Sequence, residues 1–346
     1  MKNMKFLKEI DSIISISSRE KQAREVIKKI AKQYECEPIF DNLGSTFINI
    51  KSKQKSENKV MLSFPMDESG YMVRGITSTG EIQLVGVSNQ TSVNLLGQIL
   101  LLMTKEGKRF EGYTIFPKLD LKESSKNELL LKEEDCIVEF GFSSKEDAIK
   151  KGVNIGDSVV IKTLLDEKES LLITRGLDVK VSLYMINELV EAIDQLDLDF
   201  DVIIGGVVQE KVGYRGSVSA TTTVQPSINI SFAFESETST YGCGSGVFIK
   251  TFDKTTLPNI DMANFITKHC NVHAHISDFG TSASFIHKSL TGVPSVVMGI
   301  HGRNIGLQTQ MCHKDDIQAY VKEITKIVTT LSLEDINQIK GCTHYE

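Results

Sequence analysis

Hydrophobic and polar positions follow two different patterns along the chain, one shared by both ends and another in the middle. At both ends, segments with helical spacing of apolar residues alternate with short apolar runs, which predicts helices between strands. In the first part we expect helices over residues 4–16 and 20–34 and strands over 46–51 and 60–64. Past residue 164 the expected strands are 201–209, 227–234, 246–251, 272–277 and 294–300, and the expected helices are 179–196, 259–270, 282–290 and 315–331.

The middle of the chain has the pattern of a small β-rich module. Residues 71–163 contain short strands separated by turns, with one short helix within residues 145–161. Strands that alternate with helices favour a mixed sheet covered on both faces. We therefore expect an α/β sandwich with a central mixed sheet from residues 1–69 and 164–346, and an inserted β-barrel-like domain from residues 70–163.

Composition narrows the classes of partner. The chain of 346 residues is 40% hydrophobic and carries a net charge of −6, which argues against a nucleic-acid or anionic-membrane surface. No apolar run is long enough to span a bilayer, and charges interrupt the apolar stripe of residues 4–16, unlike a signal peptide. The six cysteines form no C-x-x-C pair. Reduced thiols and a cytoplasmic location are the expectation.

Acidic residues follow several of the expected strands. Asp67 comes shortly after residues 60–64, Asp178 after residues 171–174, and Glu210 directly after residues 201–209. Open α/β sheets hold ligands at the carboxyl ends of their strands, so these side chains are candidates for a site. An acidic residue at a strand end also often only caps the next helix, and that alternative stays open.

Spaced motifs add a family resemblance that covers most of the chain. They are FPMDESGYMV (64–73), EFGFSSKEDAIKKGVNIGD (139–157), RGLDVKVS (175–182), VVQEKVGYRGS (207–217) and GVPSVVMGI (292–300). With these segments in this order, the chain resembles the metallo-aminopeptidases of peptidase family forty-two. These TET aminopeptidases include glutamyl and deblocking aminopeptidases and homologues labelled endoglucanases. The resemblance implies an aminopeptidase-type sandwich whose inserted domain serves dimerisation and assembly.

The resemblance also implies a site, and most of its metal ligands are replaced. Family members use two divalent metals and a glutamate as general base. The base position falls on Glu210, its orienting partner on Asp67, and the bridging metal ligand on Asp178. Four other ligand positions fall on residues of another type, with Glu235 as a possible substitute ligand. The four replacing residues are Pro65, Lys211, Ala233 and Gly306.

Lys211 is the most informative of these replacements. An ammonium group cannot ligate a metal and repels it, so we expect Lys211 to pair with Asp178 and Glu210. The expected cofactor content is accordingly none, or at most one weakly bound zinc, cobalt or manganese ion. His273 and His275 share one face of an expected strand and are a weaker, alternative metal pair, although such pairs are also common at surfaces.

Three functions remain open from the sequence. The main interpretation is a non-peptidase or strongly impaired homologue that acts in assembly or ligand binding. Its partners would be further copies of itself, from dimer to dodecamer, an active paralogue, or a peptide. The alternative is an active aminopeptidase or other hydrolase with a remodelled, perhaps single-metal site, a glycosidase using Glu210 and Asp178 included. The third is a protein with an interaction surface alone.

Overall fold

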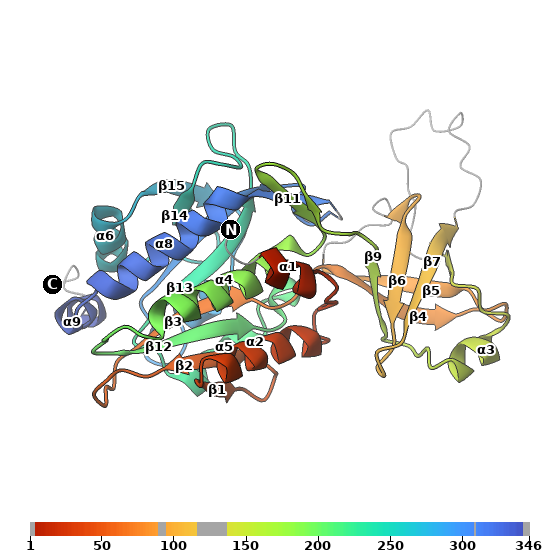
Figure 1. Ribbon diagram of the computed structural model, residues 1–346, viewed down its shortest axis with the longest axis horizontal. Coiled ribbons are helices and arrows are strands. Elements are labelled where there is room, and N and C mark those ends of the chain that lie inside the picture. Colours follow the sequence, from red (N-terminus) through yellow and green to blue (C-terminus); the bar gives the residue numbers. More distant parts are fainter. Residues whose placement is uncertain (1–3, 89–94, 116–136, 308, 342–346) are drawn as a thin grey trace.

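The computed structural model describes residues 4–88, 95–115, 137–307 and 309–341, which form two parts set side by side (Figure 1). One part is an α/β sandwich around an 11-stranded sheet, and the other is a closed barrel of strands. The mixed α/β class and the small barrel predicted from the sequence are both confirmed.

The large sheet is mixed, with parallel strands at its centre. Its strand order is β1-β2-β12-β3-β13-β16-β17-β11-β10, with β14 paired to β16 and β15 paired to β14. Neighbours β12, β3, β13 and β16 run parallel, whereas β2 and β17 pair antiparallel with them. The strands are β1 (Glu37–Phe40), β2 (Thr46–Ile50), β3 (Lys59–Pro65), β10 (Asp166–Glu167), β11 (Leu171–Thr174), β12 (Asp201–Val207), β13 (Ile228–Ser236), β14 (Val247–Asp253), β15 (Val272–Ser277), β16 (Ser295–Arg303) and β17 (Gln310–His313).

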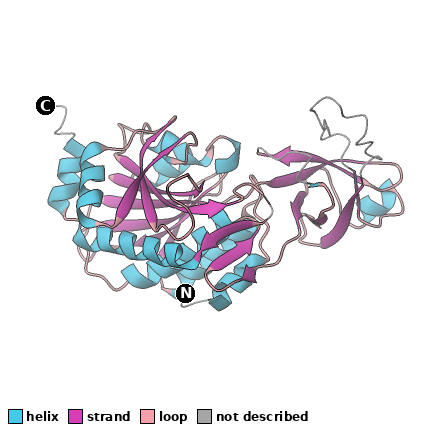
Figure 2. Ribbon diagram, turned by 90° about the horizontal axis from the view of Figure 1, so that it is seen from above, coloured by secondary structure: helices cyan, strands magenta, loops and turns pink. Residues whose placement is uncertain are grey.

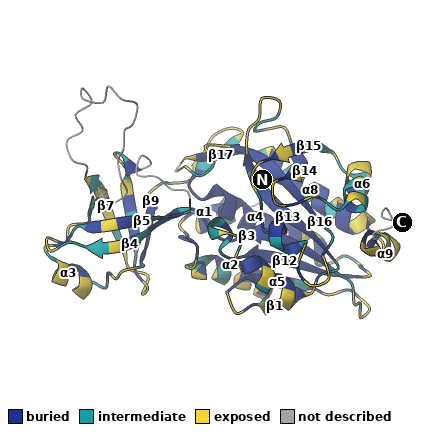
Figure 3. Cartoon of the chain, turned by 180° about the vertical axis from the view of Figure 1, so that it is seen from behind, coloured by how far each residue is buried: buried dark blue, intermediate teal, exposed yellow. Residues whose placement is uncertain are grey.

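Helices cover both faces of this sheet because its central strands are apolar on both sides (Figures 2 and 3). Successive residues of a strand point to opposite faces. Leu62 and Ile204 therefore pack into one core, while Met61 and Ile203 pack into the other. The first core is covered by α1 (Met4–Asp11), α2 (Lys21–Gln33), α4 (Leu177–Ile193), α6 (Ile260–His269), α8 (Lys314–Thr330) and α9 (Leu333–Gly341), and the second by α5 (Gly216–Val224) and α7 (Ala283–Ile286).

The barrel has its own apolar core. Its strands close in the order β4-β5-β8-β7-β6-β9, with inward-facing residues such as Tyr71, Leu84 and Leu102 buried together. The chain enters the barrel at β4 and leaves it after β9, as an insertion requires. The exact domain limits at residues 70 and 163 stay a prediction. The elements are β4 (Gly70–Ile76), β5 (Ile82–Val87), β6 (Ile99–Met103), β7 (Arg109–Ile115), β8 (Ile137–Glu139), α3 (Lys145–Lys150) and β9 (Ser158–Ile161).

Several local predictions differ from the structure, among them the helix expected over residues 282–290, which is only the short α7 (Ala283–Ile286). The first helix ends at Asp11, not at residue 16, because the segment after it runs extended and Ile16 forms a bridge with Glu68. Helix α5 was missed because its sequence, GSVSATTTV, is rich in residues of low helix propensity. It is helical through packing, since Ala220 and Val224 are buried against the sheet.

Two observations bear on the expected environment. Within the described ranges, no helix is long and apolar enough to cross a bilayer. Cys36, Cys243, Cys270 and Cys312 are free thiols, whereas Cys136 and Cys342 lie outside the described residues.

Candidate functional site

The carboxyl ends of the central strands open into a cleft. Because β12, β3 and β13 are parallel neighbours, the residues that follow them meet at one edge of the sheet. A cleft of about 490 Å³ lies at this edge. It gathers all five positions at which the resemblance puts metal ligands, together with the base position and the substitute ligand. These residues are Pro65, Asp178, Glu210, Lys211, Ala233, Glu235 and Gly306. Their proposed roles stay predictions.

Asp67 lies beneath the cleft, fully buried, and holds the backbone of the base position. Its carboxylate accepts hydrogen bonds from the backbone N–H groups of Glu210 at 2.8 Å and Lys211 at 3.0 Å. It also accepts one from the hydroxyl of Ser17, a residue that the sequence did not single out. Burial raises the pKa of the Asp67 carboxyl above its ordinary value, although these donors oppose the shift. Asp67 therefore orients the turn that presents Glu210.

Glu210 begins the short 3-10 helix η3 (Glu210–Val212), and its side chain is only 9% exposed. The residue before it, Gln209, has a left-handed backbone with a φ of 57°, which turns the chain sharply out of β12. The Glu210 carboxylate accepts hydrogen bonds from the hydroxyl and the backbone N–H of Ser282. Burial raises the pKa of the Glu210 carboxyl, and the Lys211 ammonium and Ser282 offset only part of that shift. A buried carboxyl with a raised pKa can accept a proton near neutral pH.

Lys211 points into the cleft and not to solvent. Its Nζ lies 2.6 Å from a carboxylate oxygen of Asp178, which confirms the expected ion pair with that residue. The Lys211 side chain is 24% exposed and that of Asp178 only 5%. Burial alone would lower the pKa of the Lys211 ammonium, but the carboxylates of Asp178 and Glu210 outweigh it and raise that pKa. Lys211 is therefore charged near neutral pH.

Glu235 takes part in a buried network at the wall of the cleft. One carboxylate oxygen lies 2.5 Å from Lys250 Nζ, and the other accepts a hydrogen bond of 2.6 Å from the Ser277 hydroxyl. His275 Nε2 lies 3.3 Å from the same oxygen. Burial alone would raise the pKa of Glu235, but His275 and Lys250 outweigh it and lower that pKa to about 2. Lys250 and Ser277 were missed because only tertiary contacts bring them to Glu235.

The two histidines that the sequence paired share one face of their strand but bond to different partners. Both lie on β15, but His275 is directed at Glu235 whereas His273 Nε2 lies 3.2 Å from His301 Nε2. In the part of the chain that the structure describes, no three His, Cys, Asp or Glu residues are grouped so as to hold a metal ion.

The donors in the cleft do not match the two-metal set that the resemblance implies. Pro65, Ala233 and Gly306 have no side-chain ligand atom, and Lys211 is a cation bonded to the Asp178 carboxylate. Glu235 is already bonded to an ammonium group. The residues at these positions therefore do not fit a metal pair.

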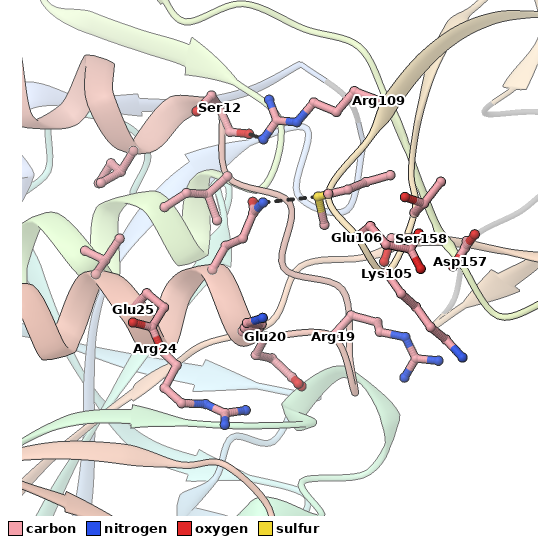
Figure 4. Close-up of a pocket in the computed structure, with 18 of the residues that line it drawn as sticks. Ser12, Arg19, Glu20, Arg24, Glu25, Lys105, Glu106, Arg109, Asp157 and Ser158 are labelled. Carbon is pink, nitrogen blue, oxygen red and sulfur yellow. Dashed lines mark hydrogen bonds between the residues drawn. The ribbon is translucent and has the colours of Figure 1, made fainter. Parts of the chain in front are cut away.

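A larger cavity of about 810 Å³ lies between the first two helices and the barrel (Figure 4). Its walls mix cations such as Arg19 and Lys105 with acids such as Glu106, and Arg109 donates a hydrogen bond of 2.9 Å to the carbonyl of Ser12. This cavity contains no convergent set of reactive groups comparable to the cleft among its described lining residues.

Glu20 connects this larger cavity to the cleft. It is only 3% exposed, and its carboxylate accepts a hydrogen bond of 3.1 Å from the backbone N–H of Gln209, the residue before Glu210. Burial and the nearby Asp67 carboxylate raise the pKa of Glu20 to about 7. No sequence signal marks Glu20, because its proximity to Asp67 arises only when α2 packs beside β12.

Comparison with known proteins is consistent with this geometry. The sequence model of the family described as M42 glutamyl aminopeptidase matches residues 44–322. The glutamyl aminopeptidase of Lactococcus lactis subsp. cremoris is 27% identical, over 97% of this chain and 98% of that protein.

Solved structures share the fold over nearly the whole chain. A TET aminopeptidase from a marine sediment archaeon of the Thaumarchaeota superposes with a TM-score of 0.88 at 22% identity, over 98% of this chain and 99% of that one. The TET1 peptidase of Pyrococcus horikoshii, which can assemble into a tetrahedron or a large octahedral shell, superposes with a TM-score of 0.83 at 22% identity, over 94% of this chain and 98% of that one.

These findings correct one expectation from the sequence. M42 aminopeptidases are dinuclear metal enzymes, so the expectation of no metal, or at most one weakly bound zinc, cobalt or manganese ion, is wrong. With a family model that spans most of its length and an aminopeptidase relative that it matches from end to end, the chain belongs to the M42 glutamyl aminopeptidase family.

Proposed function

We propose that this protein is an aminopeptidase that removes the N-terminal residue of peptides in the cleft, with Glu210 as general base. The observation that carries the proposal is the placement of Glu210. Its buried carboxyl has a raised pKa, is fixed by Ser282, and follows a turn held by Asp67. The relatives support the reaction class, since they include a glutamyl and a lysyl aminopeptidase. They favour this alternative over the main interpretation from the sequence, an impaired non-peptidase.

The residues of the cleft suit hydrolysis of a peptide bond. Glu210 takes a proton from a water molecule while the water oxygen attacks the carbonyl carbon of the peptide bond. When the C–N bond breaks, Glu210 returns the proton to the leaving amine. Among the described residues that line the cleft, Lys211 supplies the positive charge that stabilises the oxyanion of the intermediate. Asp178 keeps this ammonium in place at 2.6 Å. The acidic walls favour a free, positively charged peptide N-terminus over a blocked one.

The first test is an assay with a panel of glutamyl, lysyl and leucyl chromogenic substrates. Glu210→Gln is expected to lower kcat/KM by roughly 10²- to 10⁴-fold, since the amide cannot accept the proton. Glu237→Gln is the matched control, because Glu237 bonds to Arg303 outside the cleft lining and its change leaves activity unaltered. The assay is run with a chelator and, separately, with added zinc, cobalt or manganese, because M42 aminopeptidases are dinuclear metal enzymes. Absence of hydrolysis in every condition would contradict the proposal.

A second candidate function is peptide binding without hydrolysis. The ion pair of Lys211 with Asp178 favours it, because this pair occupies two positions where the resemblance puts metal ligands. Calorimetry measures whether a peptide binds, and mass spectrometry then shows whether the peptide is still intact. An intact bound peptide would support binding alone. Recovery of the shortened peptide and the free amino acid would support the aminopeptidase.

We further propose that the barrel mediates self-association, since the TET1 peptidase of the same fold can assemble into a tetrahedron or a large octahedral shell. Its strands expose several apolar side chains. These are Val85, Ile99, Tyr113 and Ile115, and they are 38%, 39%, 60% and 45% exposed. The pair Tyr113→Asp and Ile115→Asp is expected to reduce the mass measured by light scattering to that of smaller species. Leu257→Asp, an equally exposed position on the sandwich, is the control and leaves the mass unchanged.

A further inference from the structure

A cluster of histidines lies on one face of the sheet beyond the cleft. His273 on β15 is paired across β14 through Phe248 to Gly299 on β16, so these three positions share a face. His301, two residues after Gly299, is on that face as well. Gly299 has no side chain, and the Phe248 ring occupies the space above it. The two histidines thus lie on either side of Gly299, and the Phe248 ring of β14 occupies the space that a side chain at Gly299 would take.

A hydrogen bond of His301 determines which of its two ring nitrogens carries the hydrogen. Its Nδ1 lies 3.1 Å from the backbone carbonyl oxygen of Ser236, which can only accept, so Nδ1 carries the hydrogen. In the neutral ring the lone pair is therefore on Nε2. A histidine whose Nδ1–H is bonded to a carbonyl and whose Nε2 is directed at a second ligand is the usual arrangement of a metal ligand.

The spacing between the two rings matches that arrangement. His301 Nε2 and His273 Nε2 are 3.2 Å apart, and their ring planes differ by only 16°. Zinc–nitrogen bonds of about 2.0–2.1 Å in tetrahedral geometry place two ligand nitrogens about 3.3 Å apart. The Tyr241 ring stacks on His273 at 3.8 Å and holds it in this orientation. The two nitrogens therefore need little rearrangement to share an ion.

Both rings are neutral near pH 7, as a metal ligand requires. Burial and the neighbouring His301 and His275 lower the pKa of His273 to about 4, and burial lowers that of His301. Near pH 7 both imidazoles are neutral, and His301 offers the lone pair of its Nε2. His273 donates its Nε2 hydrogen to His301 in the metal-free pair and offers that nitrogen to an ion once the hydrogen moves to Nδ1. His301 is fully buried whereas His273 is partly exposed, so an ion reaches the pair from the His273 side.

We propose that His273 and His301 bind one divalent transition-metal ion, with water in its remaining positions. Imidazole ligands select zinc, copper or nickel over magnesium or calcium. His275 is not a ligand, because its Nε2 is directed at Glu235. No third His, Cys, Asp or Glu joins the pair among the described residues, so the ion is exchangeable. This site lies outside the ligand positions implied by the family resemblance and does not depend on the proposed aminopeptidase reaction.

The test is calorimetric titration of the full chain with zinc at pH 7. His273→Ala is expected to bind one zinc per chain fewer than the wild type, or to bind it at least tenfold more weakly. His269→Ala, a histidine at the end of α6 away from the pair, is the control and retains the wild-type stoichiometry. Zinc bound elsewhere in the chain contributes equally to the wild type and to His273→Ala, so the difference between their stoichiometries reports on this site alone.

Two further measurements keep the proposal falsifiable. His301 is buried and its replacement could unfold the chain, so circular dichroism accompanies every variant and His273→Ala carries the argument. Anomalous diffraction at the zinc edge is expected to show a peak between the two Nε2 atoms. Equal zinc stoichiometry and affinity in the wild type and His273→Ala, or no peak at this position, would mean that the two rings only share a hydrogen bond.

Discussion

Two buried clusters of charge differ in their balance of acids and bases. In the cleft cluster, the carboxyl groups of Asp67, Asp178 and Glu210 surround the single ammonium of Lys211. A second cluster, here called the junction cluster, lies where α1 meets β11 and α4 and consists of Asp11, Glu68, Arg175 and Lys180. There each acid has its own base, with Arg175 Nη1 2.5 Å from Glu68 and Lys180 Nζ 2.8 Å from Asp11.

The difference in balance appears in the pKa values. In the cleft cluster, burial raises the pKa of both Asp67 and Glu210, since one ammonium cannot compensate all the carboxylates around it. In the junction cluster, burial of Asp11 is outweighed by Lys180, and the Asp11 pKa is lowered. Where each buried carboxylate has its own cation, the ion pairs hold the elements together. Where buried carboxyl groups outnumber the cations, their pKa rises and one of them can accept a proton. Perturbed carboxyls in a cleft are a general mark of functional sites.

The sharpest test of this comparison is Lys211→Met. It leaves the carboxylates of the cleft without a cation, so we expect a loss of about 3–5 kcal/mol in the free energy of unfolding at pH 7. Urea denaturation followed by circular dichroism measures it. Lys254→Met, which removes an exposed partner of Asp278, is the control and stays close to the wild type. A loss at Lys211 no larger than that of the control would show that the cleft cluster is not coupled as described.

Glu20→Gln is expected to change how stability depends on pH. The pKa of Glu20 is about 7 in the folded protein and near 4.5 when unfolded, so folding favours its protonated form. This contribution is complete below pH 4.5 and is lost as the pH rises through 7. The neutral variant is therefore expected to exceed the wild type at pH 8 by at most about 3 kcal/mol and to match it at about pH 4. Parallel stability curves for the two proteins would contradict the assignment.

A smaller loss than for Lys211→Met is expected from Lys180→Met in the junction cluster. Asp11 would still accept hydrogen bonds from the Thr174 hydroxyl and the backbone N–H of Leu165. We therefore expect a loss of about 1–3 kcal/mol in the free energy of unfolding, less than for Lys211→Met. The same urea titration compares the two variants directly. The reverse order of the two losses would break the distinction between balanced and unbalanced clusters.

The sequence by itself determined the fold class, the barrel and the family. A short apolar run such as residues 201–209, rich in valine and isoleucine, is typical of a strand covered on both faces. It also indicated Asp67, Asp178 and Glu210, because a residue that follows a central strand must lie at the edge where that strand ends. The family resemblance placed Lys211 opposite Asp178, and the 2.6 Å ion pair agrees.

Only the tertiary structure decided which side chains meet. It paired His273 with His301 and not with His275, joined Lys250 to Glu235, and placed Glu20, the residue just before α2, beside Asp67. Each of these contacts joins residues that lie far apart in the sequence. Spacing along a strand fixes the face on which a side chain lies, but the neighbour that it meets depends on strand order, register and helix packing, and these are set by burial of the whole core at once.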